Sequence, residues 1–211
     1  MARNPRWNLP LGDWRQVFSD WIRTPEPRAL MNASIFFDFR PVYGHVDLAF
    51  ELRDSIFADI DKQPLFLNLL AANALENPPP LGFLGNLLLE TGGDHKNEFD
   101  LKARGMMPLA DAARVLTYER RLSAVGTLER FDALAELADG PGAVAAEAAF
   151  AFGWMMALRG RQGLAHCDSG RFVDPAALSS LERKSLKLAF AAIGEMQTVL
   201  RARFQLDLLR G

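Results

Sequence analysis

An acid and a base stand two residues apart in the apolar segment SIFFDFRPVYG, which covers residues 34–44. In an extended strand residues i and i+2 share a face, so the pattern predicts a strand with Asp38 and Arg40 on one side. Ile35 and Phe37 fall on the other. A guanidinium can bind a nucleotide phosphate or pair with a carboxylate. Two interpretations therefore stay open, a contact with nucleotide or protein substrate and an ion pair or helix cap at a domain junction.

The same two-residue spacing recurs where Lys102 follows Asp100, and Arg114 lies on the next expected helix. Lys102 and Arg114 are candidates for phosphate contacts. The alternative is that Asp100 caps or pairs locally and that Arg114 pairs with a carboxylate.

A third polar group lies at the end of a long apolar helix. Arg159 and Gln162 are three residues apart and His166 follows four later, so they share one side of the helix. They would line a cleft or form a solvated surface. Lys184 and Lys187 share a helical face, and a solvated face is the better interpretation of that pair.

Recognised catalytic motifs are absent from the sequence. There is no glycine-rich phosphate loop, no nucleophile elbow and no zinc-binding pair of histidines. The three histidines lack metal-ligand spacing, and the one cysteine, Cys167, forms no disulfide within the chain. These observations give no support to an independent enzyme.

The composition narrows the class of protein. The net charge is −2, which argues against nucleic-acid binding as the main role, and the single cysteine fits the cytoplasm. The N-terminus has no apolar core of signal-peptide length, and no apolar run reaches the length of a membrane span.

Apolar spacing of three and four residues predicts helices over most of the chain. A capping box of Ser179 and Glu182 opens the last of them. The sequence predicts a mainly α protein, an antiparallel helical bundle with a short strand or small β element near the N-terminus. The expected helices cover residues 11–23, 48–60, 64–75, 110–122, 128–137 and 143–166, followed by the last long helix.

Several segments together resemble a known family. SIFFDFRPVYGHVDLAFELR resembles the D-x-R-x-x-x-G-[DH]-x-x-L segment that follows the catalytic core of PII-type uridylyltransferases. It is more similar to bacterial nucleotidyltransferases of signal-transduction proteins, which usually carry cyclic-nucleotide-binding and CBS domains. EFDLKARGMMPLADAARVL, ALRGRQGL and VDPAALSSLERKSLKLAFAAIGEMQTVLRARF resemble the helical substrate-binding domain of that family. His45 departs from the usual acid.

The resemblance implies two parts, the end of a nucleotidyltransferase domain at 1–44 and a helical substrate-binding domain at 45–211. The family's catalytic half has a glycine-serine turn and a D-x-D pair, which hold the triphosphate and magnesium. This chain has no such turn and no such catalytic pair. Asp59 and Asp61 match the D-x-D spacing, but they lie at an expected helix end. The chain alone is therefore expected to be inactive and to hold no cofactor. Magnesium and a nucleoside triphosphate would belong to a catalytic domain preceding Met1.

On this hypothesis the chain orients an acceptor, with a protein as one candidate, and homo-oligomers are compatible with it. The substrate-binding candidates are Asp38, Arg40, Lys102, Arg114, Arg159 and Gln162. The alternative is a helical protein-interaction or regulatory module. Convergence of the four basic residues on one concave surface would favour acceptor binding, and their dispersal would favour the interaction module.

Overall fold

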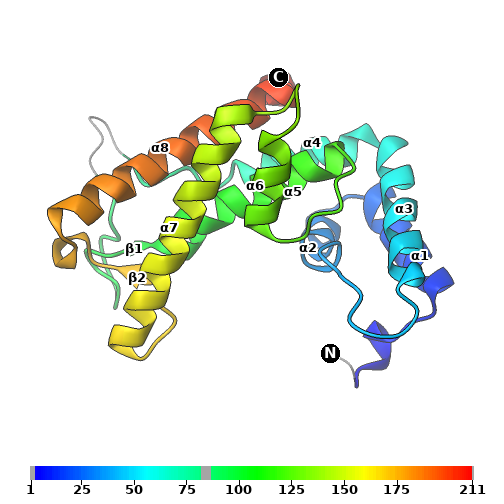
Figure 1. The fold of residues 1–211 in the computed structure, drawn as a ribbon, viewed down its shortest axis with the longest axis horizontal. Coiled ribbons are helices and arrows are strands. Elements are labelled where there is room, and N and C mark those ends of the chain that lie inside the picture. The colour runs from blue at the N-terminus through cyan, green and yellow to red at the C-terminus, as the bar shows by residue number, and fades with distance from the viewer. Residues whose placement is uncertain (1–2, 82–86, 211) are drawn as a thin grey trace.

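The computed structural model describes residues 3–81 and 87–210, and it is mainly α, as predicted (Figure 1). Short 3₁₀ turns at residues 5–7, 175–177 and 206–210 and a π-helical turn at Lys102–Met106 complete the regular structure. The helices are α1 (Leu11–Arg23), α2 (Pro27–Phe36), α3 (Asp47–Asp61), α4 (Pro64–Ala74), α5 (Met107–Glu119), α6 (Thr127–Ala135), α7 (Gly142–His166) and α8 (Ser180–Arg203).

Helices α4 to α8 form the predicted bundle. Helix α7 packs against α6 on one side and α8 on the other, and α5 contacts α4, α6 and α8. The capping box at the start of α8 is confirmed, because Ser179 Oγ accepts from the N–H of Glu182 and Glu182 Oε2 accepts from the N–H of Ser179. The apolar stripe of α8 is buried, with Leu186, Phe190, Ile193, Met196 and Leu200 in the core.

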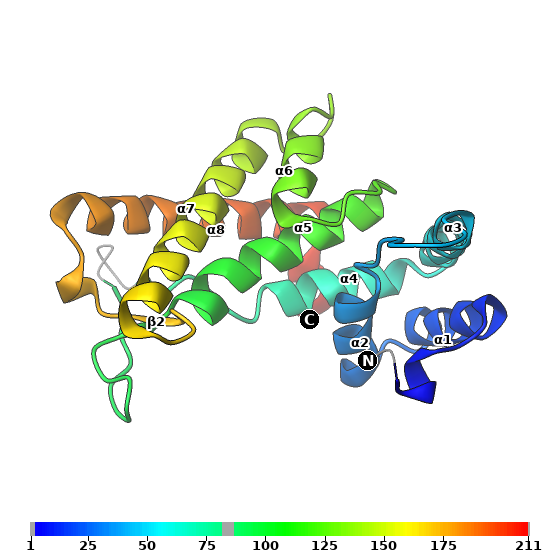
Figure 2. The ribbon, with the colours of Figure 1, turned by 60° about the horizontal axis from the view of Figure 1, so that its bottom comes forward.

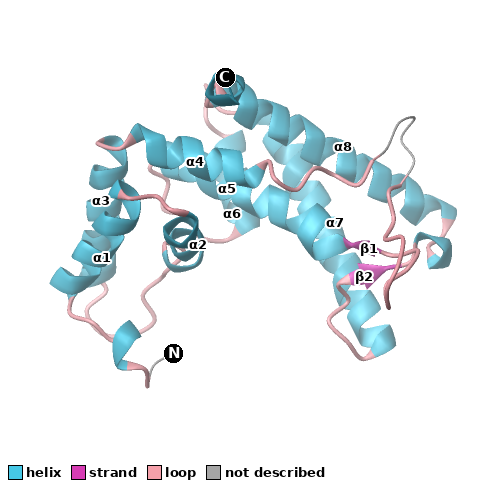
Figure 3. Ribbon diagram, turned by 180° about the vertical axis from the view of Figure 1, so that it is seen from behind, coloured by secondary structure: helices cyan, strands magenta, loops and turns pink. Residues whose placement is uncertain are grey.

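A two-stranded antiparallel sheet joins the segment that precedes α5 to the segment between α7 and α8 (Figure 3). Strand β1 (Phe99–Asp100) precedes α5, and β2 (Phe172–Val173) lies between α7 and α8. Gly170, at φ +59°, allows the turn before β2, since a Cβ there would overlap the carbonyl oxygen of Arg159.

The N-terminal helices form an arm beside the bundle. Helix α3 lies along α1, and Figure 2 shows α2 between this pair and the bundle. Aromatic side chains fill the arm, with Phe18 and Phe37 buried and Trp14 packed against Phe18. The arm therefore has its own apolar contacts, which continue into the bundle where Phe37 meets Phe66.

The predicted strand at residues 34–44 is wrong. Residues 27–36 are helical, and residues 37–46 form an irregular connection to α3. Leu30, Ala33 and Phe37 are buried at helical spacing, whereas Ile35, expected on the same face as Phe37, is 54% exposed. Helical packing of this stripe outweighed the β preference of the aromatic residues. Pro41 then restricts the preceding residue to extended backbone.

The other helices begin and end within a few residues of their expected positions, except that α5 begins at Met107 rather than Ala110. An apolar segment follows the prolines at 78–80 in the sequence, and it falls partly outside the described residues. Within the described residues, no helix is both long enough and apolar enough to cross a membrane.

Candidate functional site

The carboxylate of Asp38 is the most heavily bonded acid in the described part of the chain. Oδ1 accepts hydrogen bonds from Tyr118 Oη at 2.8 Å and Arg130 Nη2 at 2.5 Å. Oδ2 accepts from Arg114 Nε at 3.1 Å and Nη2 at 2.9 Å, and from Arg130 Nη1 at 3.3 Å. A carboxylate has about four lone-pair sites, so Asp38 has no acceptor capacity left for a ligand.

Three elements bring these groups together. Arg114 and Tyr118 are four residues apart on α5 and therefore share a side of that helix. Arg130 lies on α6, and only 2% of its side chain is exposed. Its Nε donates to the carbonyl of Ala124 at 3.0 Å, which fixes its orientation. Asp38 itself follows α2, so the cluster joins the arm to α5 and α6.

The two arginines set the ionisation of the cluster. Burial alone would raise the pKa of Asp38, but the hydrogen bonds from Arg130 and the charge of Arg114 outweigh it and lower this pKa below the usual value. Burial, followed by the negative charge of Asp38, raises the pKa of Tyr118, so the hydroxyl keeps its proton. Arg114 also binds Asp111 at 2.6 Å, and burial raises the pKa of Asp111 despite this pair.

This geometry favours the structural interpretation of Asp38 and Arg114. Each pairs with a group of opposite charge at the junction, as the alternative to substrate binding required. Arg40, two residues further on, is exposed and makes no hydrogen bond or ion pair with the described residues. A binding role for Arg40 stays a prediction.

Asp100 accepts a local backbone hydrogen bond, as its alternative interpretation stated, whereas its ion pair is with a residue 71 positions away in the sequence. Its Oδ2 lies 2.6 Å from Arg171 Nη2 across the small sheet, and Oδ1 accepts from the N–H of Ala103 at 2.9 Å. Burial would raise the pKa of Asp100, yet the hydrogen bond from Arg171 outweighs it and lowers this pKa. Lys102 is exposed and has no such partner among the described residues.

Arg159 and Gln162 lie near the C-terminal end of α7. Arg159 Nε donates to the carbonyl of Ser169 at 3.0 Å, and Gln162 Oε1 lies 3.1 Å from His166 Nε2. Arg159 also lines an open hollow of about 490 Å³ with Met106 and Met156. A ligand contact by Arg159 or Gln162 stays a prediction.

The four basic candidates do not line one concave surface. Arg114 is enclosed at the junction, and neither Arg40 nor Lys102 lines the hollow beside Arg159. Arg40 belongs to the connection between α2 and α3, and the end of α7 that carries Arg159 lies at the other end of the molecule (Figure 1). This dispersal is the feature expected of an interaction module.

The acidic pair at the end of α3 does not fit a magnesium site. Asp59 lies 3.4 Å from Lys62 Nζ, and Asp61 lies 3.2 Å from Arg121 Nη1. Residues two apart on a helix also point in different directions. Within residues 3–81 and 87–210, no group of three or more acidic, histidine or cysteine side chains has the arrangement of a metal site.

The arm carries an apolar groove of about 360 Å³. The connection between α2 and α3 exposes further large apolar side chains, including Val42 at 89% and Tyr43 at 99%. Apolar surface of this extent commonly marks a contact with another protein or domain. The groove is lined by Leu9, Leu11, Trp14, Phe18, Phe36, Phe39, Leu48, Ala49 and Leu52.

The roles of Tyr118, Arg130 and Arg171 were not predicted from the sequence. A signal for Arg130 was available, because it occupies an inward position next to Phe131 on α6, where an arginine requires a buried acid. Tyr118 stands four residues after Arg114, a spacing that places both on one side of a helix. Nothing in the local sequence marks Arg171 as the partner of Asp100.

Comparison with known proteins gives two matches. A family model described as "Putative nucleotidyltransferase substrate binding domain" matches residues 64–204, more than half of the chain. A second model, described as "Putative nucleotidyltransferase", matches residues 1–28. Neither the curated proteins nor the solved structures contain a match to this chain.

Proposed function

Because the chain belongs to the family described as nucleotidyltransferase substrate-binding domains, we propose that its helical bundle binds and orients the acceptor of a nucleotidyl transfer. The catalytic residues would lie in a separate domain. The observation that supports this proposal is that the boundaries of the family match coincide with the boundaries of the helical bundle. The match begins at Pro64, the first residue of α4, and ends at Phe204, the residue that caps α8.

The arm is the surface that a catalytic domain would contact. The match to the nucleotidyltransferase model ends at residue 28, in the first turn of α2, and covers α1. The apolar groove and the exposed Val42 and Tyr43 lie on this same arm. A catalytic domain continuous with α1 would cover these side chains.

The Asp38 cluster supplies the rigidity that such a role requires. It fixes the segment after α2 to α5 and α6 through two buried or nearly buried arginines. A catalytic domain seated on the arm would therefore be held at a defined position relative to the bundle. Holding two reactants in a productive geometry removes a large part of the entropic barrier to reaction.

The finer assignments are proposals too. A PII-uridylyltransferase-like reaction with a protein acceptor, a role in signal transduction beside CBS and cyclic-nucleotide-binding domains, and a cytoplasmic location all come from the resemblance alone. Magnesium and the nucleoside triphosphate would be held by the catalytic domain, since the acidic pair of α3 does not fit the ion.

The test compares three proteins, each incubated with magnesium and a nucleoside triphosphate labelled at the α-phosphate. They are this chain, a family catalytic domain, and the two joined in one polypeptide, with cell proteins as the acceptor pool. We expect label transfer only from the joined protein, while the catalytic domain alone still binds a fluorescent nucleotide. Transfer by this chain alone, or equal transfer by the catalytic domain alone, would contradict the proposal.

A second candidate function is a protein-interaction module without a substrate pocket. The dispersal of Arg40, Lys102, Arg114 and Arg159 favours it. It predicts that the joined protein transfers label no faster than the catalytic domain alone.

A further inference from the structure

The outer face of α8 carries a regular line of exposed residues. Their spacing alternates between three and four, which is the spacing of the contact seam in a coiled coil. Leu181 and Leu188 are each 71% exposed, a large apolar exposure for a bundle helix. The residues of this line, the α8 seam, are Leu181, Lys184, Leu188, Ala191, Glu195 and Thr198.

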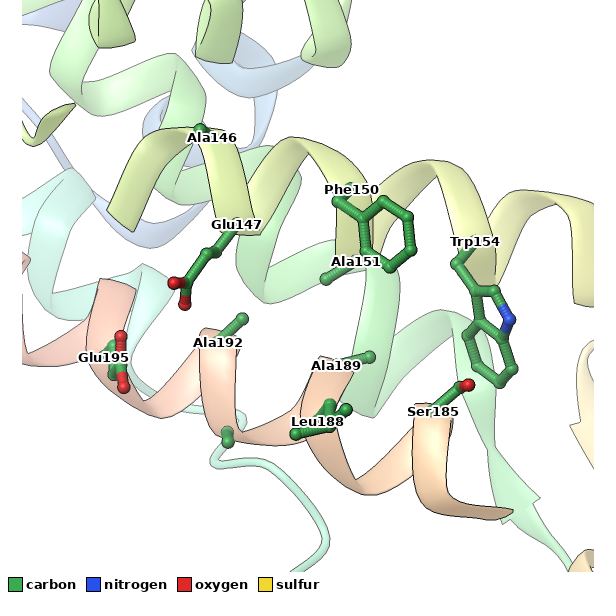
Figure 4. A pocket seen from close by; sticks show the side chains of 11 residues that line it. Ala146, Glu147, Phe150, Ala151, Trp154, Ser185, Leu188, Ala189, Ala192 and Glu195 are labelled. Carbon is green, nitrogen blue, oxygen red and sulfur yellow. The ribbon is translucent and has the colours of Figure 1, made fainter. Parts of the chain in front are cut away.

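A groove of about 520 Å³ runs beside the α8 seam, between α7 and α8 (Figure 4). Small side chains line it on both helices, among them Ala151, Ala189 and Ala192. Phe150, 76% exposed, stands on its α7 side. An apolar knob of another helix would find a hole of suitable size here, which is bordered at one end by the carboxylates of Glu147 and Glu195 (Figure 4).

We propose that the α8 seam binds the α8 seam of a second copy of this chain, with the two helices antiparallel. In this arrangement Leu188 of each copy lies opposite Ala191 of the other and enters the alanine-lined groove. Lys184 lies opposite Glu195, and by two-fold symmetry this ion pair forms twice. Leu181 lies opposite Thr198, so all six residues of the seam are used over about 26 Å of helix.

The order of charges along the seam argues for a second copy as the occupant. A base lies towards the N-terminal end, an acid towards the C-terminal end, and the residues between them are apolar. Only antiparallel self-pairing places each charge opposite its complement, since a parallel pair would put lysine against lysine. Lys184 and Glu195 form no ion pair within the described part of the chain, so both are available for this contact.

The proposed interface is separate from the surface assigned to the catalytic domain. The seam and groove belong to α7 and α8, whereas the apolar groove of the arm belongs to α1, α2 and α3 and their connections. Dimerisation therefore does not depend on the proposed transfer reaction, and either proposal can fail alone.

The test is sedimentation equilibrium of the 211-residue chain and its charge-reversal variants over a wide concentration range. We expect a dimer for the native sequence. Lys184→Glu and Glu195→Lys each place two like-charge pairs in the interface and should raise the dimer Kd at least about tenfold. The double variant Lys184→Glu/Glu195→Lys restores both pairs, so its Kd should return close to the native value.

Two further variants frame the result. Leu188→Glu should abolish the dimer, because it removes the apolar knob and places a carboxylate in the alanine-lined groove. Lys96→Glu makes the same charge change as Lys184→Glu on an exposed loop residue and should leave the Kd unchanged. Circular dichroism checks that each variant is folded. A native chain that stays monomeric, or a double variant that is no better than the single ones, would overturn the proposal.

Discussion

Asp38 and Asp100 begin the same short pattern, an aspartate followed two residues later by a base, and the structure uses them differently. Neither pairs with its neighbouring base. Asp38 binds Arg114, Tyr118 and Arg130 on two helices, whereas Asp100 binds Arg171, which immediately precedes strand β2, and one backbone N–H. The side chain of Asp100 is the less exposed of the two, at 9% against 21%.

The difference lies in the partners rather than in the acids. The side chain of Arg130 is 2% exposed and that of Arg114 is 14% exposed, whereas that of Arg171 is 45% exposed. A cation that stays in contact with water loses little when its acid is removed, but an enclosed cation is left uncompensated. The burial of the cation therefore indicates which aspartate the fold depends on.

The largest effect should come from Asp38→Asn. The substitution leaves Arg114 and Arg130 close together without their shared anion, and we expect the free energy of unfolding to fall by about 3 kcal/mol. Asp100→Asn is the matched control and should lower it by about 1 kcal/mol, because Arg171 can be solvated. Urea denaturation followed by circular dichroism measures both.

Equal losses from Asp38→Asn and Asp100→Asn would show that partner burial is not the deciding factor. A larger loss from Asp100→Asn would reverse the comparison. It would show that the stability of the fold depends more on the small sheet than on the junction.

A smaller effect is expected from Tyr118→Phe. The change removes one hydrogen bond to Asp38 and keeps the buried ring, so the free energy of unfolding should fall by about 1 kcal/mol. Tyr43→Phe makes the same chemical change at a 99% exposed residue and should have no measurable effect. Thermal unfolding of the two variants, measured side by side, would contradict the assignment if their midpoints moved equally.

The pH dependence offers another test of the cluster. The lowered pKa of folded Asp38 means that the unfolded chain binds its proton first as the pH falls. Asp38 therefore stabilises the fold above the usual carboxyl pKa of about 4, and this contribution is lost as the pH falls through the folded value. The raised pKa of Asp111 acts in the opposite direction. Urea denaturation between about pH 6 and about pH 2, on either side of the usual carboxyl pKa, tests this. As the pH falls, we expect the free energy of unfolding of Asp38→Asn to decrease less steeply than that of the native chain.

The smallest effect on stability should come from Arg40→Ala. Arg40 is exposed and lies only two residues beyond the anchored Asp38, so its loss should change the free energy of unfolding by less than about 0.5 kcal/mol. If it contacts the acceptor or nucleotide, the joined protein carrying Arg40→Ala should show a raised KM with an unchanged melting temperature. An unchanged KM would remove Arg40 from the candidate binding residues.

Sequence patterns located the helices because their apolar residues repeat at a spacing that only a helix can bury on one side. The capping box at Ser179 is one example and is confirmed. The stripe of Leu48, Leu52, Ile56 and Ile60 is another, and it is buried except for Leu48, which is 48% exposed. The segment at 34–44 was misassigned because its aromatic residues favour a strand locally. Its helical part is fixed by tertiary packing of Leu30, Ala33 and Phe37, which a local pattern does not contain.

The partners of Asp38 could not be predicted from local sequence. Arg114, Tyr118 and Arg130 follow it by 76, 80 and 92 residues, so spacing along the chain gives no information about their contact. The division of the chain at residues 44 and 45 likewise stays a prediction. Helix α3, placed after that division, packs along α1, before it.

The long separation between Asp38 and its partners has a consequence for the order of folding. The bundle helices mostly meet their neighbours in sequence, and such contacts form quickly, whereas the Asp38 cluster closes a loop of more than 70 residues. The site that binds Asp38 exists only after α5 and α6 have packed together, because each of these helices supplies an arginine. We therefore expect the arm to join a bundle that has already formed, and stopped-flow refolding should show the tryptophan fluorescence of the arm changing after the helical signal of the bundle.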